Sequence, residues 1–172
     1  MPELLTKRHA RTRPMTRNQI AAAIEALDLD CVKFKLMYGN EDGSWSRDKA
    51  EAVCKVYRRF LLLCATRDEL IVPNEDVDAF WHGHILDTEK YAMDCEVFCG
   101  RFLHHYPYSG MNGEEDADRS RIAFEETRRI YEAEFGEAYE GGKAKSRDCY
   151  SCMNPSSDGP NGWRPTLPAY KV

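Results

Sequence analysis

The chain has 172 residues, a net charge of −5 and 42% hydrophobic residues, which is the composition of one ordinary soluble domain with its own core. No apolar run approaches the roughly 20 residues that a membrane-spanning helix needs, and the basic start of the chain lacks the apolar core of a secretory signal. We therefore expect a cytoplasmic protein without a membrane partner, whose seven cysteines are mostly reduced.

The first predicted element is a basic, flexible N-terminal segment over residues 1–15. Residues 1–17 hold five Lys and Arg side chains against one Glu, whereas the stretch from Glu114 to Glu140 is strongly acidic. This distribution fits a frayed terminus better than a nucleic-acid arm. We expect no nucleic-acid partner for the body of the domain.

A helical domain is predicted over residues 16–140. Thr16 can cap a first helix that runs to about Leu27. Residues 28–37 alternate apolar side chains with lysines, which fits a short strand, and a brief helix is the alternative. A strong helix should begin at Ser46, with apolar side chains at helical spacing (Val53, Tyr57, Phe60, Leu61 and Cys64).

Two further helices are predicted in the second half of the domain. One opens at Asn74 or Asp76 and continues to Gly100, a residue type that often follows a helix C-terminus. The other runs from about Asp116 to Tyr139. Because all these segments have an apolar face that must be buried, we predict a mainly α fold, a single compact helical domain of about four main helices.

Residues 141–172 are rich in proline and glycine and have no helical or strand pattern, so we expect an extended tail. Cys149 and Cys152 have the spacing of half a zinc site, which Cys95 and Cys99 could complete. A surface cysteine pair without a role is the alternative. We favour a tail that docks on the domain without zinc, through three apolar side chains (Trp163, Leu167 and Tyr170).

Histidines gather in one short window of the chain. Four of the five histidines lie between Asp78 and Pro107, together with two cysteines and three aspartates. Imidazole, thiolate and carboxylate groups bind transition metals, so the window predicts a metal site. On an unbroken helix His82 would lie about 160° around the axis from His84, and one ion could bind both only if the helix were distorted near Gly83.

The chain is predicted to turn at Gly100 and to return along this helix. The return would bring His104 and His105 to the same site, beside His84 and either His82 or Asp87. Cys95 could join them only after a further bend, because it lies roughly 16 Å along a straight helix from His84. The candidate metal ligands are therefore His82, His84, Asp87, Cys95 and His105.

Two other side chains of the window are candidate catalytic groups. Tyr91 and His104 would act in acid–base chemistry or would orient the metal ligands. Asp78 is interpreted as an early-helix charge that complements the helix dipole, and not as a ligand. The mixed ligand types leave iron, copper and zinc as candidate cofactors.

One part of the window resembles a known family. The motif Trp-His-x-His-Ile-Leu-Asp-Thr-x-x-Tyr at residues 81–91, followed by Phe-Leu-His-His at residues 102–105, resembles the glycine-rich domain-containing protein-like family of plants and bacteria, and its short bacterial members in particular. The likeness extends from about Ile20 to Tyr139. It implies a site at the window and no defined activity. The added domains and glycine-rich tails of the plant members have no counterpart in this sequence, so roles based on them do not carry over.

Three functions compete on this sequence. The first is a small metalloenzyme, oxygen-dependent or hydrolytic, that acts on a small molecule or a peptide. The second is a non-catalytic module that binds a peptide or a protein partner and holds a structural metal ion. The third has no metal, and the histidines form a buried polar network. An open coordination position would distinguish the first function from the second.

Overall fold

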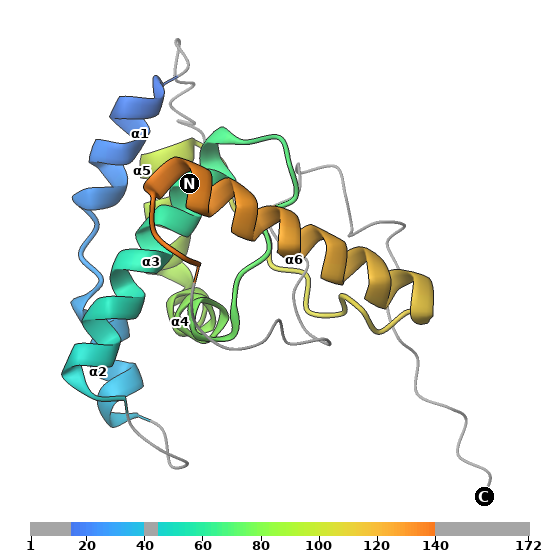
Figure 1. The fold of residues 1–172 in the computed structure, drawn as a ribbon. Coiled ribbons are helices and arrows are strands. Elements are labelled where there is room, and N and C mark those ends of the chain that lie inside the picture. The colour runs from blue at the N-terminus through green and yellow to red at the C-terminus, as the bar shows by residue number, and fades with distance from the viewer. Residues whose placement is uncertain (1–14, 40–44, 140–172) are drawn as a thin grey trace, which may run out of the picture.

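The computed structural model describes residues 15–39 and 45–139 (Figure 1). These residues form six helices and no strand, which confirms the predicted mainly α fold. The helices are α1 (Arg17–Glu25), α2 (Asp30–Tyr38), α3 (Arg47–Thr66), α4 (Glu75–Ile85), α5 (Thr88–Cys99) and α6 (Glu114–Phe135). The predicted N-terminal segment and the tail, with Cys149 and Cys152, lie outside the described residues apart from Met15.

Three helices begin where the sequence places a capping side chain. The Thr16 hydroxyl accepts from the Gln19 amide, and the Gln19 side chain accepts in turn from the Thr16 amide, a complete capping box at α1. Ser46 and Asn74 accept from backbone amides in the first turns of α3 and α4. Each cap satisfies an amide that has no partner within its helix.

The strand interpretation of residues 28–37 is wrong, because this stretch forms α2. Val32 and Leu36, four residues apart, are its buried side chains, and Lys33 forms ion pairs with Asp30 and Glu51. An alternating pattern over so few residues also fits one face of a short helix. Here packing against α3 and α4 determines the outcome.

The single helix predicted from Asn74 to Gly100 is also wrong, because the chain breaks into α4 and α5 at Leu86 and Asp87. Asp87 leaves helical geometry, with φ −89° and ψ 76°. On a straight helix, residues ten apart would be separated by about 15 Å. The break instead allows Trp81 Nε1 to donate to the Tyr91 hydroxyl at 2.9 Å.

Gly83 has a packing role and does not mark the break. A Cβ atom at this position would lie 3.2 Å from a methyl group of Val32 on α2, closer than most side-chain contacts. The absence of a side chain therefore lets α2 pack closely against α4. A second glycine, Gly136, ends α6 in the left-handed region, with φ 66°, four residues after Glu132, whose carbonyl oxygen accepts from its amide.

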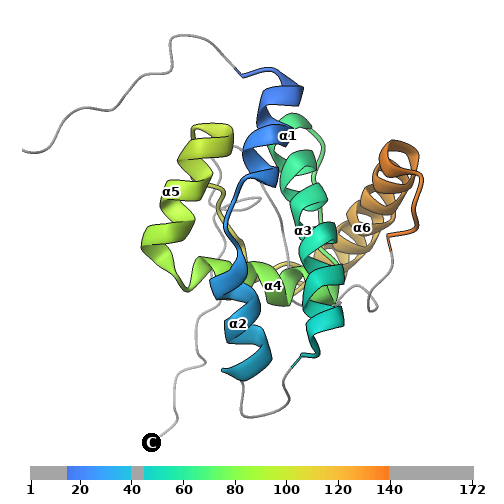
Figure 2. The same ribbon diagram turned by 90° about the vertical axis from the view of Figure 1, so that its left-hand side faces the viewer.

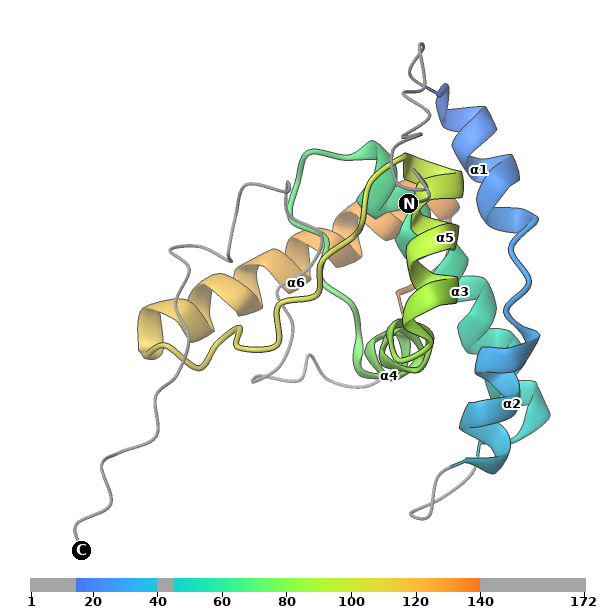
Figure 3. The ribbon, with the colours of Figure 1, turned by 180° about the vertical axis from the view of Figure 1, so that it is seen from behind.

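Helix α3 is the centre of the packing. It contacts α1, α2 and α4, while α5 packs on α1 and α4 (Figure 2). Large aromatic side chains fill the space between these helices (Tyr57, Phe60, Phe80, Trp81, Tyr91 and Phe98). Helix α6 crosses the other side of α3, and its first turns extend away from the other helices (Figures 1 and 3). Within the described residues, no helix combines the length and apolarity needed to cross a membrane.

Candidate metal centre

Three side chains from two segments converge beside α4, where two of them are buried and the third is half exposed. Asp78 and His82 lie one turn apart on this helix, and His105 lies on the segment that returns after α5. His105 Nε2 is 3.0 Å from Asp78 Oδ1 and 3.0 Å from His82 Nε2. The third side of this triangle, from His82 Nε2 to Asp78 Oδ1, is 3.7 Å. Among the described residues, this is the group whose ligand atoms can hold a metal ion.

The triangle has the size that one metal ion requires. Sides of 3.0, 3.0 and 3.7 Å define a circle with a radius of about 1.9 Å, slightly shorter than the roughly 2.0–2.2 Å of zinc–nitrogen and zinc–oxygen bonds. A point at bonding distance from all three atoms therefore lies just off their plane. An ion at this point would contact two imidazoles and one carboxylate with no change in the backbone.

The electrostatics of the group also favour a cation. The side chain of Asp78 is 5% exposed and that of His105 is 9% exposed, while that of His82 is 50% exposed. A buried carboxylate needs a positive or donating partner close by. His105 Nε2 lies 3.0 Å from both Asp78 Oδ1 and His82 Nε2, so the three ligand atoms surround one point that a metal ion could occupy.

Buried contacts hold His105 in position. Its ring packs edge-on against Trp81, with 4.8 Å between the ring centroids. The Tyr91 hydroxyl accepts from Trp81 and donates to the carbonyl oxygen of Leu103 at 2.6 Å. Leu103 is fully buried and lies two residues before His105. Tyr91 and Trp81 thus attach the return segment to α4 at the level of the triangle.

His84 lies in a different, buried group. Its Nδ1 is 2.9 Å from the Tyr57 hydroxyl, and its Nε2 is 3.0 Å from Asp94 Oδ2, which also accepts from Lys90. Burial lowers the pKa of His84, although Asp94 opposes this shift, and burial raises the pKa of Tyr57. The neutral imidazole therefore accepts from Tyr57 and donates to Asp94. Both ring nitrogens have partners here, and His84 does not join the triangle.

The structure places the other predicted site residues apart from the triangle. Asp87 is exposed at the break between α4 and α5. Cys95 is fully buried, and burial raises the pKa of its thiol. His104 is exposed, with its ring against Phe102. Burial raises the pKa of Tyr91, whose hydroxyl belongs to the contacts that hold His105.

Asp78 is the member of the group that the sequence interpretation did not select. Its position in the first turn of α4 suits an acidic side chain for the helix dipole alone, so its type carried no further signal. The usable signal was its spacing, because Asp78 and His82 are four residues apart and share a helix face.

A comparison with protein-family models matches residues 22–130 to the family described as UCP032817-like. The chain belongs to this family. The match covers Asp78, His82 and His105, and thus both segments that form the triangle. No curated protein and no solved structure matches the chain. The resemblance to the glycine-rich domain-containing protein-like family stays a prediction.

Proposed function

We propose that this protein binds one transition-metal ion through Asp78, His82 and His105, and that the ion is the reactive centre of a small metalloenzyme. The observation that supports this proposal is the spacing of the three donor atoms, 3.0, 3.0 and 3.7 Å apart on two converging segments. The three donor atoms come from side chains that are one turn apart on α4 and from a segment that returns after α5, so one ion could contact all three.

The types of the three donor groups limit which metal ions and which reactions are expected. Two imidazoles and one carboxylate are the ligands of non-haem iron(II) oxygenases and also suit catalytic zinc. Three protein donors fill only part of the four to six positions of either ion. The half-exposed side chain of His82 faces solvent, so water or a substrate can reach the remaining positions. Such an ion would supply either oxygen activation or a hydroxide for hydrolysis.

A structural ion is the second candidate function. It is favoured by the sequence separation of the donors, because His105 lies 23 residues after His82 and an ion would tie the return segment to α4. In this case the ion would be coordinatively closed. A non-catalytic surface of the domain would then bind a peptide or protein partner.

Metal titration of purified protein without a histidine tag tests the proposal. We expect one zinc, iron(II) or cobalt(II) ion per chain in the wild type. Asp78→Asn, His82→Ala and His105→Ala should each weaken binding by more than about 100-fold, because even the outer partners of metal ligands contribute 10- to 100-fold. His104→Ala is the matched control, since this exposed neighbour of His105 lies outside the triangle, and it should bind like the wild type.

Equal affinities in all four variants, or no stoichiometric binding in the wild type, would contradict the proposal. Azide added to the cobalt-loaded protein separates the two candidate functions. A change in the visible spectrum shows an open coordination position, as a reactive centre requires. An unchanged spectrum favours the structural ion.

A further inference from the structure

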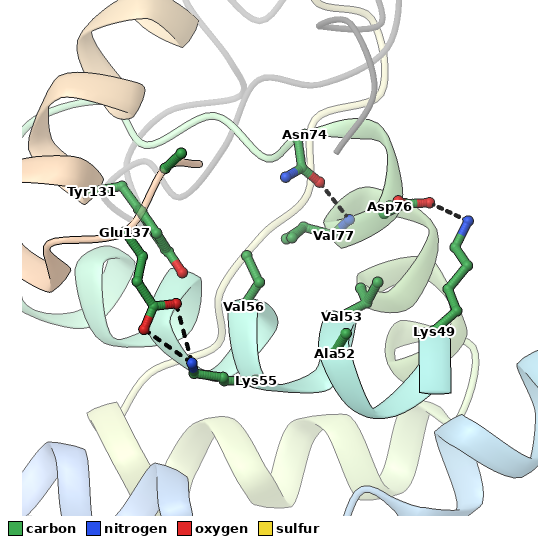
Figure 4. A pocket seen from close by; sticks show the side chains of 11 residues that line it. Lys49, Ala52, Val53, Lys55, Val56, Asn74, Asp76, Val77, Tyr131 and Glu137 are labelled. Atoms are coloured by element: carbon green, nitrogen blue, oxygen red, sulfur yellow. Dashed lines mark hydrogen bonds and ion pairs between the residues drawn. The ribbon is translucent and has the colours of Figure 1, made fainter. Parts of the chain in front are cut away.

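A pocket of about 540 Å³ lies on the side of α3 that faces the beginning of α4 and the end of α6 (Figure 4). We refer to it as the α3 pocket. Its lining residues are Lys49, Ala52, Val53, Lys55, Val56, Asn74, Asp76, Val77, Tyr131, Glu137 and Ala138. The donors of the metal triangle are not among them, so this is a second, separate feature of the domain.

The α3 pocket has an apolar floor and a charged rim. The floor consists of Val53, Val56 and Val77. Lys49 and Lys55 lie at opposite ends of the pocket (Figure 4). Each of these lysines is already paired, Lys49 with Asp76 at 2.7 Å and Lys55 with Glu137 at 3.0 Å. An apolar centre with a polar rim is typical of surfaces that bind apolar side chains of a polypeptide.

The chain itself supplies a polypeptide at the edge of this pocket. Ala138 lines the pocket, and the described residues end at Tyr139. Residues 140–172 follow, with Trp163, Leu167 and Tyr170 as their large apolar side chains near the end. A segment that starts at the rim of a pocket has a high local concentration there, of millimolar order for short flexible linkers.

Length and charge both permit this intramolecular contact. Trp163 follows Tyr139 by 24 residues, and a chain of this length can reach up to about 80 Å, which is more than the α3 pocket requires. Residues 140–172 carry five Lys or Arg and three Asp or Glu, a net charge of +2, whereas the whole chain has a net charge of −5. The C-terminal segment and the remainder of the chain therefore attract each other.

We propose that residues 140–172 dock in the α3 pocket, with Trp163 as the main apolar anchor. Pro160 and Pro165 lie on either side of this anchor, and a proline has a fixed backbone φ, so less conformational entropy is lost on docking than for other residues. This contact would bury the three valines of the pocket and stabilise the domain.

A double-mutant cycle on the full chain tests the proposal. Ala52 is exposed and lines the α3 pocket, so Ala52→Glu blocks the pocket with a tolerated helix residue. Ala92 is an exposed alanine on α5, and Ala92→Glu is the matched control. We expect Trp163→Ala to lower the melting temperature by about 3–6 °C in the wild-type and Ala92→Glu backgrounds. In the Ala52→Glu background it should change it by less than about 1 °C.

Chymotrypsin cleavage after Trp163, followed by mass spectrometry, gives a second measurement. Ala52→Glu should accelerate this cleavage at least tenfold, and Ala92→Glu should leave it unchanged. Additive melting temperatures in both backgrounds, together with equal cleavage rates, would overturn the proposal. A dimer in the wild type that Ala52→Glu converts to a monomer would also overturn it, because the occupant would then be a second copy of the chain.

Discussion

His82 and His84 lie two residues apart on α4 and have opposite surroundings. His84 is fully buried, and both its ring nitrogens are hydrogen-bonded, to Tyr57 and to Asp94. His82 is half exposed, and its Nε2 faces a second imidazole and a carboxylate. The comparison shows that residue type alone does not make a histidine a candidate metal ligand. The lone pair must also lie where other lone pairs converge and where an ion can enter.

The largest expected effect comes from a substitution in the buried group that His84 forms with Tyr57 and Asp94. His84→Ala should lower the free energy of unfolding by about 3 kcal/mol or more, because it leaves a cavity and removes the partner of a buried hydroxyl. His82→Ala, at the half-exposed site, should lower it by less than about 0.5 kcal/mol without metal. Urea denaturation of metal-free protein measures both. Similar losses in the two variants would show that the two histidines do not differ as described.

Metal addition should bring the cost of replacing His82 close to the cost of replacing His84, because only the His82 variant loses the stabilisation by the ion. An ion at 100 times its dissociation constant stabilises a folded protein by about 2.7 kcal/mol. We expect this gain in the wild type and in His104→Ala, and its loss in His82→Ala and Asp78→Asn. Thermal denaturation with and without zinc makes the measurement. A full zinc gain in His82→Ala would place the ion elsewhere.

Tyr91 contacts both the buried group of His84 and the segment that carries His105. Removal of its hydroxyl should have the next largest effect. Its ring packs edge-on against His84, and its hydroxyl holds the Leu103 carbonyl, two residues before His105. Tyr91→Phe should lower the free energy of unfolding by about 1–3 kcal/mol, because two buried hydrogen bonds lose their partner. It should also weaken metal binding by about tenfold and shift the cobalt spectrum. Unchanged binding and spectrum would limit Tyr91 to a packing role.

The smallest expected effect concerns Glu137, which lies outside both histidine groups. It describes how the stability of the domain changes in acid. Hydrogen bonds from Arg59 and Lys55 lower the pKa of Glu137 to about 2. This pKa lies below that of the unfolded chain, so the contribution of Glu137 to stability is present above about pH 4.5 and is lost as the pH falls towards 2. Glu137→Gln should therefore be slightly less stable than the wild type at pH 7. The difference should vanish near pH 2, as urea denaturation across this range would show.

Local rules predicted the helix starts, because a cap depends on neighbouring residues only. Thr16, Ser46 and Asn74 accept from their own first turns. The break at Asp87 escaped prediction because its causes are tertiary. Contacts between α4 and α5 stabilise it, and no glycine or proline marks it in the sequence.

The candidate site, like the fold, could be predicted from the sequence only in part. The density of histidines in the window predicts His82 as a ligand, and the expected return of the chain after Gly100 predicts His105; the structure places their Nε2 atoms 3.0 Å apart. The sequence does not identify Asp78 as a ligand, because an acidic side chain in the first turn of a helix is already explained by the helix dipole. The partners of His84 come from α3 and α5, and helical periodicity cannot show which of two neighbouring histidines meets them.

The two-residue turn between α4 and α5 has a consequence for insertions and deletions. The turn reverses the direction of the chain, so that two pairs of residues ten apart in the sequence are hydrogen-bonded: Trp81 with Tyr91, and His84 with Asp94. One residue added at Leu86 would change the path of this turn and shift α5 relative to α4, which would move both pairs of partners apart together. Surface connections usually accept changes in length. Although Leu86 and Asp87 are exposed, this connection acts as a fixed spacer, and natural variation in chain length should avoid it.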